Sequence, residues 1–112
     1  MEVTGVRLWV DDMREPPEEG YTWVKDVNGA KKRIERWEEI YALTGSPSVV
    51  IELIDVDHDA GFYAHFGGDY IKLLDWLEET GRNYPIRIHS MNPVGVQNMR
   101  AIIERNGWTE VR

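Results

Sequence analysis

Residues 49–61 read VVIELIDVDHDAG, an apolar run that ends abruptly in carboxylate and imidazole side chains. The Val-Val-Ile start is typical of a strand that is covered on both faces, as strands of parallel sheets are. We therefore predict a central strand over Val49–Val56, with Asp57-His58-Asp59 at its carboxyl end. Such a strand needs neighbouring strands and covering helices from the rest of the chain.

Two further apolar runs end in polar segments. Alternating apolar residues along Gly5–Val10 predict a strand that runs into Asp11-Asp12. Pro85–Ile88 predicts another strand, which enters the segment 89–92, His-Ser-Met-Asn. Shorter strands are expected at 21–24 and 108–111, and amphipathic helices at 29–43, 69–79 and 93–105.

This alternation of strands and helices predicts an α/β fold in a single domain over residues 1–112. The expected architecture is flavodoxin-like, with five parallel strands in the order 2-1-3-4-5. Asn28, Asp69 and Asn92 are the expected N-caps of the three helices. Pro93 suits the first position of the last helix.

The composition limits the classes of function. The chain carries 13 Lys and Arg against 20 Asp and Glu, a formal net charge of −7, which disfavours duplex DNA because its phosphates attract basic surfaces. The absence of cysteine excludes disulfides, thiolate zinc sites and thiol nucleophiles. No apolar run approaches the ~20 residues of a transmembrane helix, and no signal peptide is recognisable. We expect a soluble, cytoplasmic protein that does not bind membranes, and its oligomeric state stays open.

The polar segments follow the strands expected at 5–10, 49–56 and 85–88. These are the first, third and fourth strands along the chain, and they are adjacent in the expected order. Asp11, Asp12, Asp57 and Asp59 would then share one crevice, where their charges repel one another. A divalent cation, Mg²⁺ in the first place and Mn²⁺ as the alternative, would relieve this repulsion, and Asp11, Asp12 and Asp57 are its expected ligands. Raised pKa values or a cationic substrate would relieve it too, and an acidic pair also fits a plain turn.

His58 and His89 belong to the same set, and imidazole transfers protons near neutral pH. His58 fits a structural hydrogen bond as well. The start of the last helix favours anions, because its amide groups point outward there. Contacts to a substrate phosphate are therefore expected from Ser90, Asn92, Gly95 and Arg14. Asn92 also fits a cap alone, and Arg14 a solvated side chain.

The three segments together resemble a known family. Asp11-Asp12, the Asp-His-Asp-x-Gly of residues 57–61 and the His-Ser-Met-Asn-Pro-x-Gly of residues 89–95 are similar to the cyclic-phosphate processing receiver domains. These form a divergent branch of the response-regulator receiver fold, and the resemblance runs from Leu8 to about Trp108.

In ordinary receivers the positions of Asp11, Asp12 and Asp57 bind Mg²⁺ and accept a phosphoryl group, and Ser90 resembles the switch residue. The receiver Lys-Pro after the fifth strand has no match in these 112 residues. The first receiver helix is replaced by a loop with Pro16-Pro17, and the last is missing or degenerate. These departures argue against phosphorelay signalling.

The resemblance implies chemistry on a cyclic phosphate, for example a 2′,3′-cyclic phosphate of a nucleotide or an RNA end. The leading hypothesis is a metal-assisted cyclic phosphodiester hydrolase, with Asp57, His58, Asp59 and His89 as catalytic residues. His58 and His89 would divide the proton transfers, and Asp59 would orient His58 or join the metal ligands. The alternatives are a non-catalytic sensor of a nucleotide or cyclic phosphate, and a conventional receiver phosphorylated on Asp57.

Overall fold

The predicted apolar runs build the sheet. A computed structural model describes residues 3–44 and 49–112. The strands β1 (Thr4–Val10), β2 (Tyr21–Val24), β3 (Val49–Val56) and β4 (Ile86–Ile88) form a parallel four-stranded sheet in the order β2-β1-β3-β4. β3 lies between β1 and β4, which confirms its predicted central position.

The fifth predicted strand is reduced to a single bridge, so the prediction of five strands is wrong. Glu110 pairs in parallel with Ile86. The Ile86 N–H donates to the carbonyl of Thr109 at 3.0 Å, and the Val111 N–H donates to the carbonyl of Ile86 at 2.7 Å. The last segment therefore lies beside β4 as expected. β4 has only 3 residues and offers too short an edge for a longer ladder.

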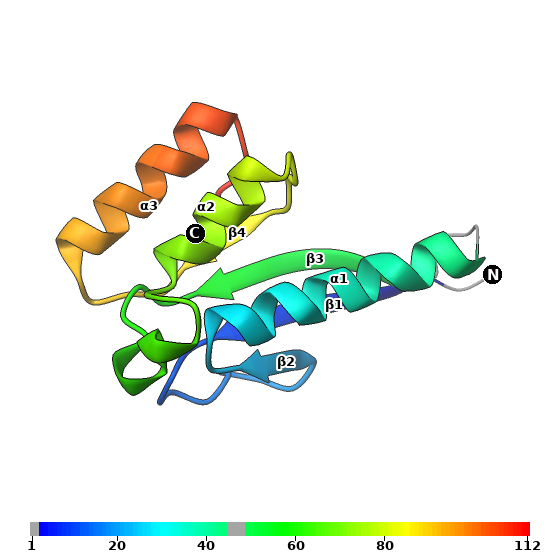
Figure 1. Ribbon diagram of the computed structural model, residues 1–112, viewed down its shortest axis with the longest axis horizontal. Coiled ribbons are helices and arrows are strands. Elements are labelled where there is room, and N and C mark those ends of the chain that lie inside the picture. The colour runs from blue at the N-terminus through cyan, green and yellow to red at the C-terminus, as the bar shows by residue number, and fades with distance from the viewer. Residues whose placement is uncertain (1–2, 45–48) are drawn as a thin grey trace.

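The helices α1 (Val27–Thr44), α2 (Ile71–Glu79) and α3 (Pro93–Asn106) lie together on one face of the sheet (Figure 1). The crossovers that contain them all advance in the same direction across the sheet, and right-handed crossovers then place every helix on one face. The core between sheet and helices includes the buried side chains of Leu8, Ile34, Ile54, Leu74 and Ile103.

The other face of the sheet differs from the expected helix cover. Within the described ranges, residues 11–20 connect β1 to β2 as a loop and form no helix, as the sequence predicts. This loop packs on the sheet through the Trp9 indole, whose Nε1 donates to the carbonyl of Arg14 at 2.8 Å. Helices therefore cover one face, while the opposite face is polar and aromatic.

The ends of the helices follow their predicted caps in one case of three. Asn92 caps α3, since its side chain accepts a hydrogen bond from the Gly95 N–H, and Pro93 opens the helix. At α1 the side chain of Asp26, and not Asn28, accepts from the Gly29 N–H. At α2 the N-cap residue is Tyr70, which makes no side-chain cap.

Asp69, the cap expected for α2, accepts instead from the Ala60 N–H at 3.1 Å. It thereby closes the segment that contains the 3-10 helix η1 (Gly61–Phe66).

Across the described ranges, no helix combines the length and the apolar character that crossing a membrane requires.

Candidate functional site

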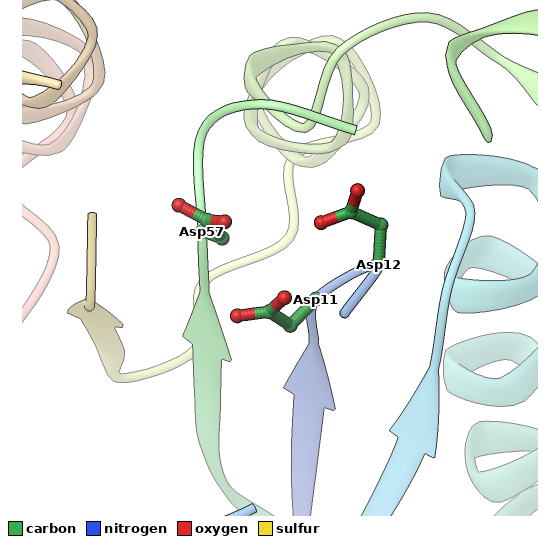
Figure 2. Close-up of side chains that lie close together, drawn as sticks. All are labelled: Asp11, Asp12 and Asp57. Carbon is green, nitrogen blue, oxygen red and sulfur yellow. The ribbon is translucent and has the colours of Figure 1, made fainter. Parts of the chain in front are cut away.

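An acidic cluster lies at the switch point of the strand order, between the neighbouring strands β1 and β3. Asp11 and Asp12 follow β1, Asp57 follows the neighbouring strand β3, and one carboxylate oxygen of each lies within 4.8 Å of the others. Figure 2 shows the three side chains around one space at the carboxyl ends of these strands. Ligands of open α/β sheets bind at this position. The structure thus brings together the three residues expected to bind a metal.

The two adjacent aspartates have opposite pKa shifts. Burial works to raise the pKa of Asp11, but the backbone N–H groups of Arg14 and Met13, both 2.9 Å from Oδ1, and the ring of His89 together lower it below its usual value. Burial raises the pKa of Asp12, and the charges of Asp11 and Asp57 add to this effect. Asp11 is therefore a stabilised anion, whereas Asp12 bears the repulsion within the cluster.

Arg14 supplies a positive charge to the acidic cluster. Its Nε lies 3.4 Å from Oδ2 of Asp11, and its Nη2 lies 3.5 Å from Oδ2 of Asp57. The side chain is 51% exposed, so solvent reaches the guanidinium although it contacts both carboxylates. The structure therefore places Arg14, from which a phosphate contact is expected, beside the acidic cluster.

His89 follows β4 and lies between two carboxylates. Its Nε2 is 2.9 Å from Oδ2 of Asp11, and its Nδ1 is 2.6 Å from Oδ1 of Asp55. The ring stacks on Trp9 with a centroid separation of 3.8 Å and an interplanar angle of 5°. Both ring nitrogens thus already have partners within the protein.

Asp55 is a site residue that the sequence analysis missed. It lies inside β3, is 0% exposed, and accepts from the Tyr21 hydroxyl at 3.2 Å in addition to its contact with His89. The burial of Tyr21 raises the pKa of its hydroxyl, and the charge of Asp55 and its hydrogen bond to Tyr21 add to this effect. The available signal was a charged residue within an apolar strand, because a buried carboxylate requires partners.

His58 forms a second part of the site together with Asp59. Its Nδ1 lies 2.8 Å from Oδ1 of Asp59, and its side chain is 15% exposed. Among the residues that the structure describes, none forms a hydrogen bond with Nε2 of His58. Asp59 therefore orients the imidazole and leaves one ring nitrogen open.

The start of α3 packs directly on the His58 ring. A Cβ atom added to Gly95 would lie 2.4 Å from Cγ of His58, so only glycine leaves room for the imidazole there. The Gly95 N–H donates to Oδ1 of Asn92 at 3.0 Å. Gly95 was expected to bind phosphate through this amide, but the amide is engaged in the cap, and the glycine instead makes space.

Ser90 and Asn92 lie beside this pair. The Ser90 hydroxyl oxygen accepts from the Asn92 N–H at 3.1 Å. The Asn92 side-chain amide lies 3.4 Å from Oδ1 of Asp59 and 3.5 Å from Nδ1 of His58. Asn92 thus joins the helix start to the His58–Asp59 pair, and Ser90 lies next to it in the same turn.

The acidic cluster fits a hard divalent cation. Carboxylate oxygens are the ligands that Mg²⁺ and Mn²⁺ prefer, and three of them converge here from two adjacent strands. Asp59, with its carboxylate turned to His58, lies outside that group. The expected crevice of four carboxylates is therefore divided into the acidic cluster and the His58–Asp59 pair.

A parallel sheet with an acidic cluster at the ends of β1 and β3 and a polar segment after β4 defines a receiver-type α/β domain. The chain belongs to the family of cyclic-phosphate processing receiver domains, whose model matches residues 6–105. This confirms the resemblance drawn from the three segments. No curated protein and no solved structure matches the chain significantly.

Proposed function

We propose that this protein hydrolyses a cyclic phosphodiester to a phosphomonoester. The observation that carries the proposal is the His58–Asp59 pair, with one ring nitrogen open, next to an acidic cluster, in a family named for cyclic-phosphate processing. In the reaction, water forms a new bond to phosphorus and one ring P–O bond breaks. The water loses a proton and the leaving oxygen gains one, so the reaction needs a group that moves protons.

His58 is our assignment for that group. Asp59 holds Nδ1, so Nε2 is the atom that takes the proton of the attacking water and returns it to the leaving oxygen. Asp57 precedes His58, and its Oδ1 accepts the backbone N–H of His58 at 2.8 Å, which fixes the pair against the acidic cluster. His89, expected to share the proton transfers, faces carboxylates at both nitrogens, and we assign it a holding role instead.

Asp11, Asp12 and Asp57 would hold the divalent cation, Mg²⁺ or Mn²⁺. When bound, it supplies positive charge that offsets the charge developing on the phosphate. The protein's own donors would bind the same phosphate group. We assign the binding of the non-bridging oxygens to the Ser90 hydroxyl proton, the Asn92 amide and the Arg14 guanidinium, which lie beside the His58–Asp59 pair and the acidic cluster.

An aromatic surface beside the site favours a nucleotide as the source of the cyclic phosphate. Phe62 is 72% exposed, and its ring lies 6.4 Å from that of Phe66, which is 46% exposed. Both belong to η1, whose first residue Gly61 lies against the carboxylate of Asp12. A nucleobase stacks well on such rings. The substrate we propose is therefore a 2′,3′-cyclic phosphate of a nucleotide or a single-stranded RNA end.

The proposal is tested by comparing His58→Gln with His65→Gln, a matched control at an exposed histidine. We expect His58→Gln to lower kcat for a 2′,3′-cyclic nucleotide by about 100-fold or more, with little change in KM, because a proton-transfer group acts mainly in the transition state. The control should retain activity within about threefold, since no proton step is assigned to His65.

Thermal unfolding of each variant checks that the fold persists. A wild-type rate in folded His58→Gln would contradict the assignment of proton transfer to His58. Ligand-induced stabilisation of the wild-type protein without any product would instead favour the non-catalytic sensor.

A further inference from the structure

Four polar side chains form a continuous line across the face of the sheet opposite the helices. The Tyr21 hydroxyl donates to Oδ2 of Asp55 at 3.2 Å, Oδ1 of Asp55 lies 2.6 Å from Nδ1 of His89, and Nε2 of His89 lies 2.9 Å from Oδ2 of Asp11. The line thus runs from the edge strand β2, through β3 and the end of β4, to the acidic cluster. We call it the Asp55 line.

The two carboxylates of the Asp55 line are buried, and its histidine is nearly so. Asp55 and Asp11 are 0% and 1% exposed, and the His89 side chain is 11% exposed. The backbone of His89 is fixed as well, because its N–H donates to the carbonyl of Val56 at 3.0 Å. Trp9, stacked on the ring, is the direct sheet neighbour of Asp55 in the register of β1 and β3. The ring therefore has little freedom to turn.

The line controls one atom of the acidic cluster. Oδ1 of Asp11 is held by two backbone amides at 2.9 Å, whereas within the protein interior Oδ2 is held by His89. Arg14, the other neighbour of Oδ2, lies farther away at 3.4 Å and is half exposed. The orientation of the Asp11 carboxylate toward Asp12 and Asp57 thus depends on the position of the His89 ring, and that position depends on Asp55.

We infer that Asp55 is a positioning residue: through His89 it holds the Asp11 carboxylate in the orientation that the divalent cation requires. This inference rests on the proposed function for the presence of the cation. Residues behind a metal ligand fix its orientation, and their loss typically weakens metal binding by about 10- to 100-fold. A carboxylate buried merely to stabilise the sheet would not have this effect.

The test compares Mn²⁺ binding, read from the electron paramagnetic resonance signal of free Mn²⁺, in three variants. Asp55→Asn removes the charge at constant shape and should raise the Kd for Mn²⁺ by about 10-fold or more. Tyr21→Phe removes a single hydrogen bond at an edge strand and should raise the Kd by a smaller factor. It keeps the inference testable if Asp55→Asn fails to fold.

Glu38→Gln is the matched control. Glu38 is also a partly buried carboxylate with a tyrosine and an arginine partner, since Tyr84 donates to it and Arg82 pairs with it at 2.8 Å. It lies near the starts of β3 and β4, at the end of the sheet away from the acidic cluster. We expect this variant to lose stability but to bind Mn²⁺ like the wild type.

A second readout needs no metal. In the wild-type protein, the N–H that joins His89 to Asp55 should give a slowly exchanging imidazole signal in ¹H–¹⁵N spectra, and Asp55→Asn should weaken or shift it. Equal Mn²⁺ affinity in the wild type and in both folded variants would overturn the inference alone. Absence of Mn²⁺ binding in the wild type, with the imidazole signal present, would contradict the cation of the proposed function and the role of Asp55 toward it.

Discussion

Adjacent aspartates at the end of β1 have different tasks because their surroundings differ. Asp11 is buried, and two amides and His89 stabilise its negative charge. Asp12 lies against Gly61, whose positive φ of 55° lets the chain pass close to the carboxylate. Asp12 has the raised pKa, and it is the member of the acidic cluster that gains most from a cation.

This difference predicts the effect of Asp12→Asn on stability. Burial and the neighbouring charges raise the pKa of Asp12 in the folded state. The contribution of Asp12 to the free energy of unfolding is therefore fully present below its unfolded pKa. It is lost as the pH rises through its folded pKa, because the ionised carboxylate is unfavourable in the folded protein. At neutral pH the metal-free variant should therefore be more stable than the wild type, by about 0.5 kcal/mol, the scale of a partly exposed charge interaction.

Thermal unfolding as a function of pH measures this effect. The advantage of Asp12→Asn should vanish under acidic conditions, where the wild-type carboxyl group is protonated. Mg²⁺ should raise the Tm of the wild type but have little effect on the variant. A variant that is less stable at neutral pH, with an unchanged response to Mg²⁺, would argue against this role of Asp12.

At the scale of single residues, the sequence predicted what depends on strand ends and missed what depends on the far side of the sheet. Asp11, Asp12 and Asp57 each follow an apolar run, so topology alone placed them together. Asp55 lies one residue inside its strand, and its partner Tyr21 is 34 positions away. That pairing requires the register of β2, β1 and β3, which a single sequence does not display.

At the scale of the elements, the start of α3 determines the position of His58. Asn92 ends the loop, Pro93 begins the helix, and the first turn brings Gly95 against the imidazole. The site therefore depends on the close approach of a helix to the loop after β3. The glycine permits this approach, although glycine inside a helix has an unfavourable propensity of about 1 kcal/mol relative to alanine.

Gly95→Ala tests this packing. The new Cβ atom would meet the His58 ring at 2.4 Å, so the ring must move away from its place beside Asp59. We expect kcat to fall by about 10- to 100-fold, because a displaced catalytic group loses its alignment. Circular dichroism should show an unchanged helix content.

Gln97→Ala, an exposed position on the same helix, is the control and should retain the wild-type rate. Full activity of Gly95→Ala would contradict the packing of the His58 ring against Gly95 or the role of His58 in proton transfer.

The helix caps illustrate a limit of sequence reasoning at this scale. Asn28, Asp69 and Asn92 are all suitable cap residues, yet only Asn92 caps its helix. Asp26 is equally suitable and begins α1 earlier, and Asp69 is used to close the η1 segment instead. Short polar residues compete for the same backbone amides, and tertiary contacts decide among them.

At the scale of the whole molecule, the one-sided placement of the helices explains the site. The crossovers place α1, α2 and α3 on one face (Figure 1). On the other face, the loop after β1 packs on the sheet through Trp9. The His58–Asp59 pair then meets the start of α3, while the Asp55 line supports the acidic cluster from the opposite face. The alternation of elements predicted the parallel sheet and the order of its strands, but it did not predict the short β4, the unformed fifth strand, the helix-free face or the Asp55 line.

The most direct test of the central claim is ³¹P NMR of the wild-type protein with a 2′,3′-cyclic nucleotide, first with Mg²⁺ and then after addition of EDTA. We predict that the cyclic phosphate signal is replaced by that of a monoester and that EDTA stops the conversion, because Asp11, Asp12 and Asp57 provide the carboxylate ligands for the cation. Conversion at the same rate in EDTA would contradict the role of the metal. An unchanged cyclic phosphate signal with folded protein, in Mg²⁺ and in Mn²⁺, would contradict the proposed hydrolysis itself.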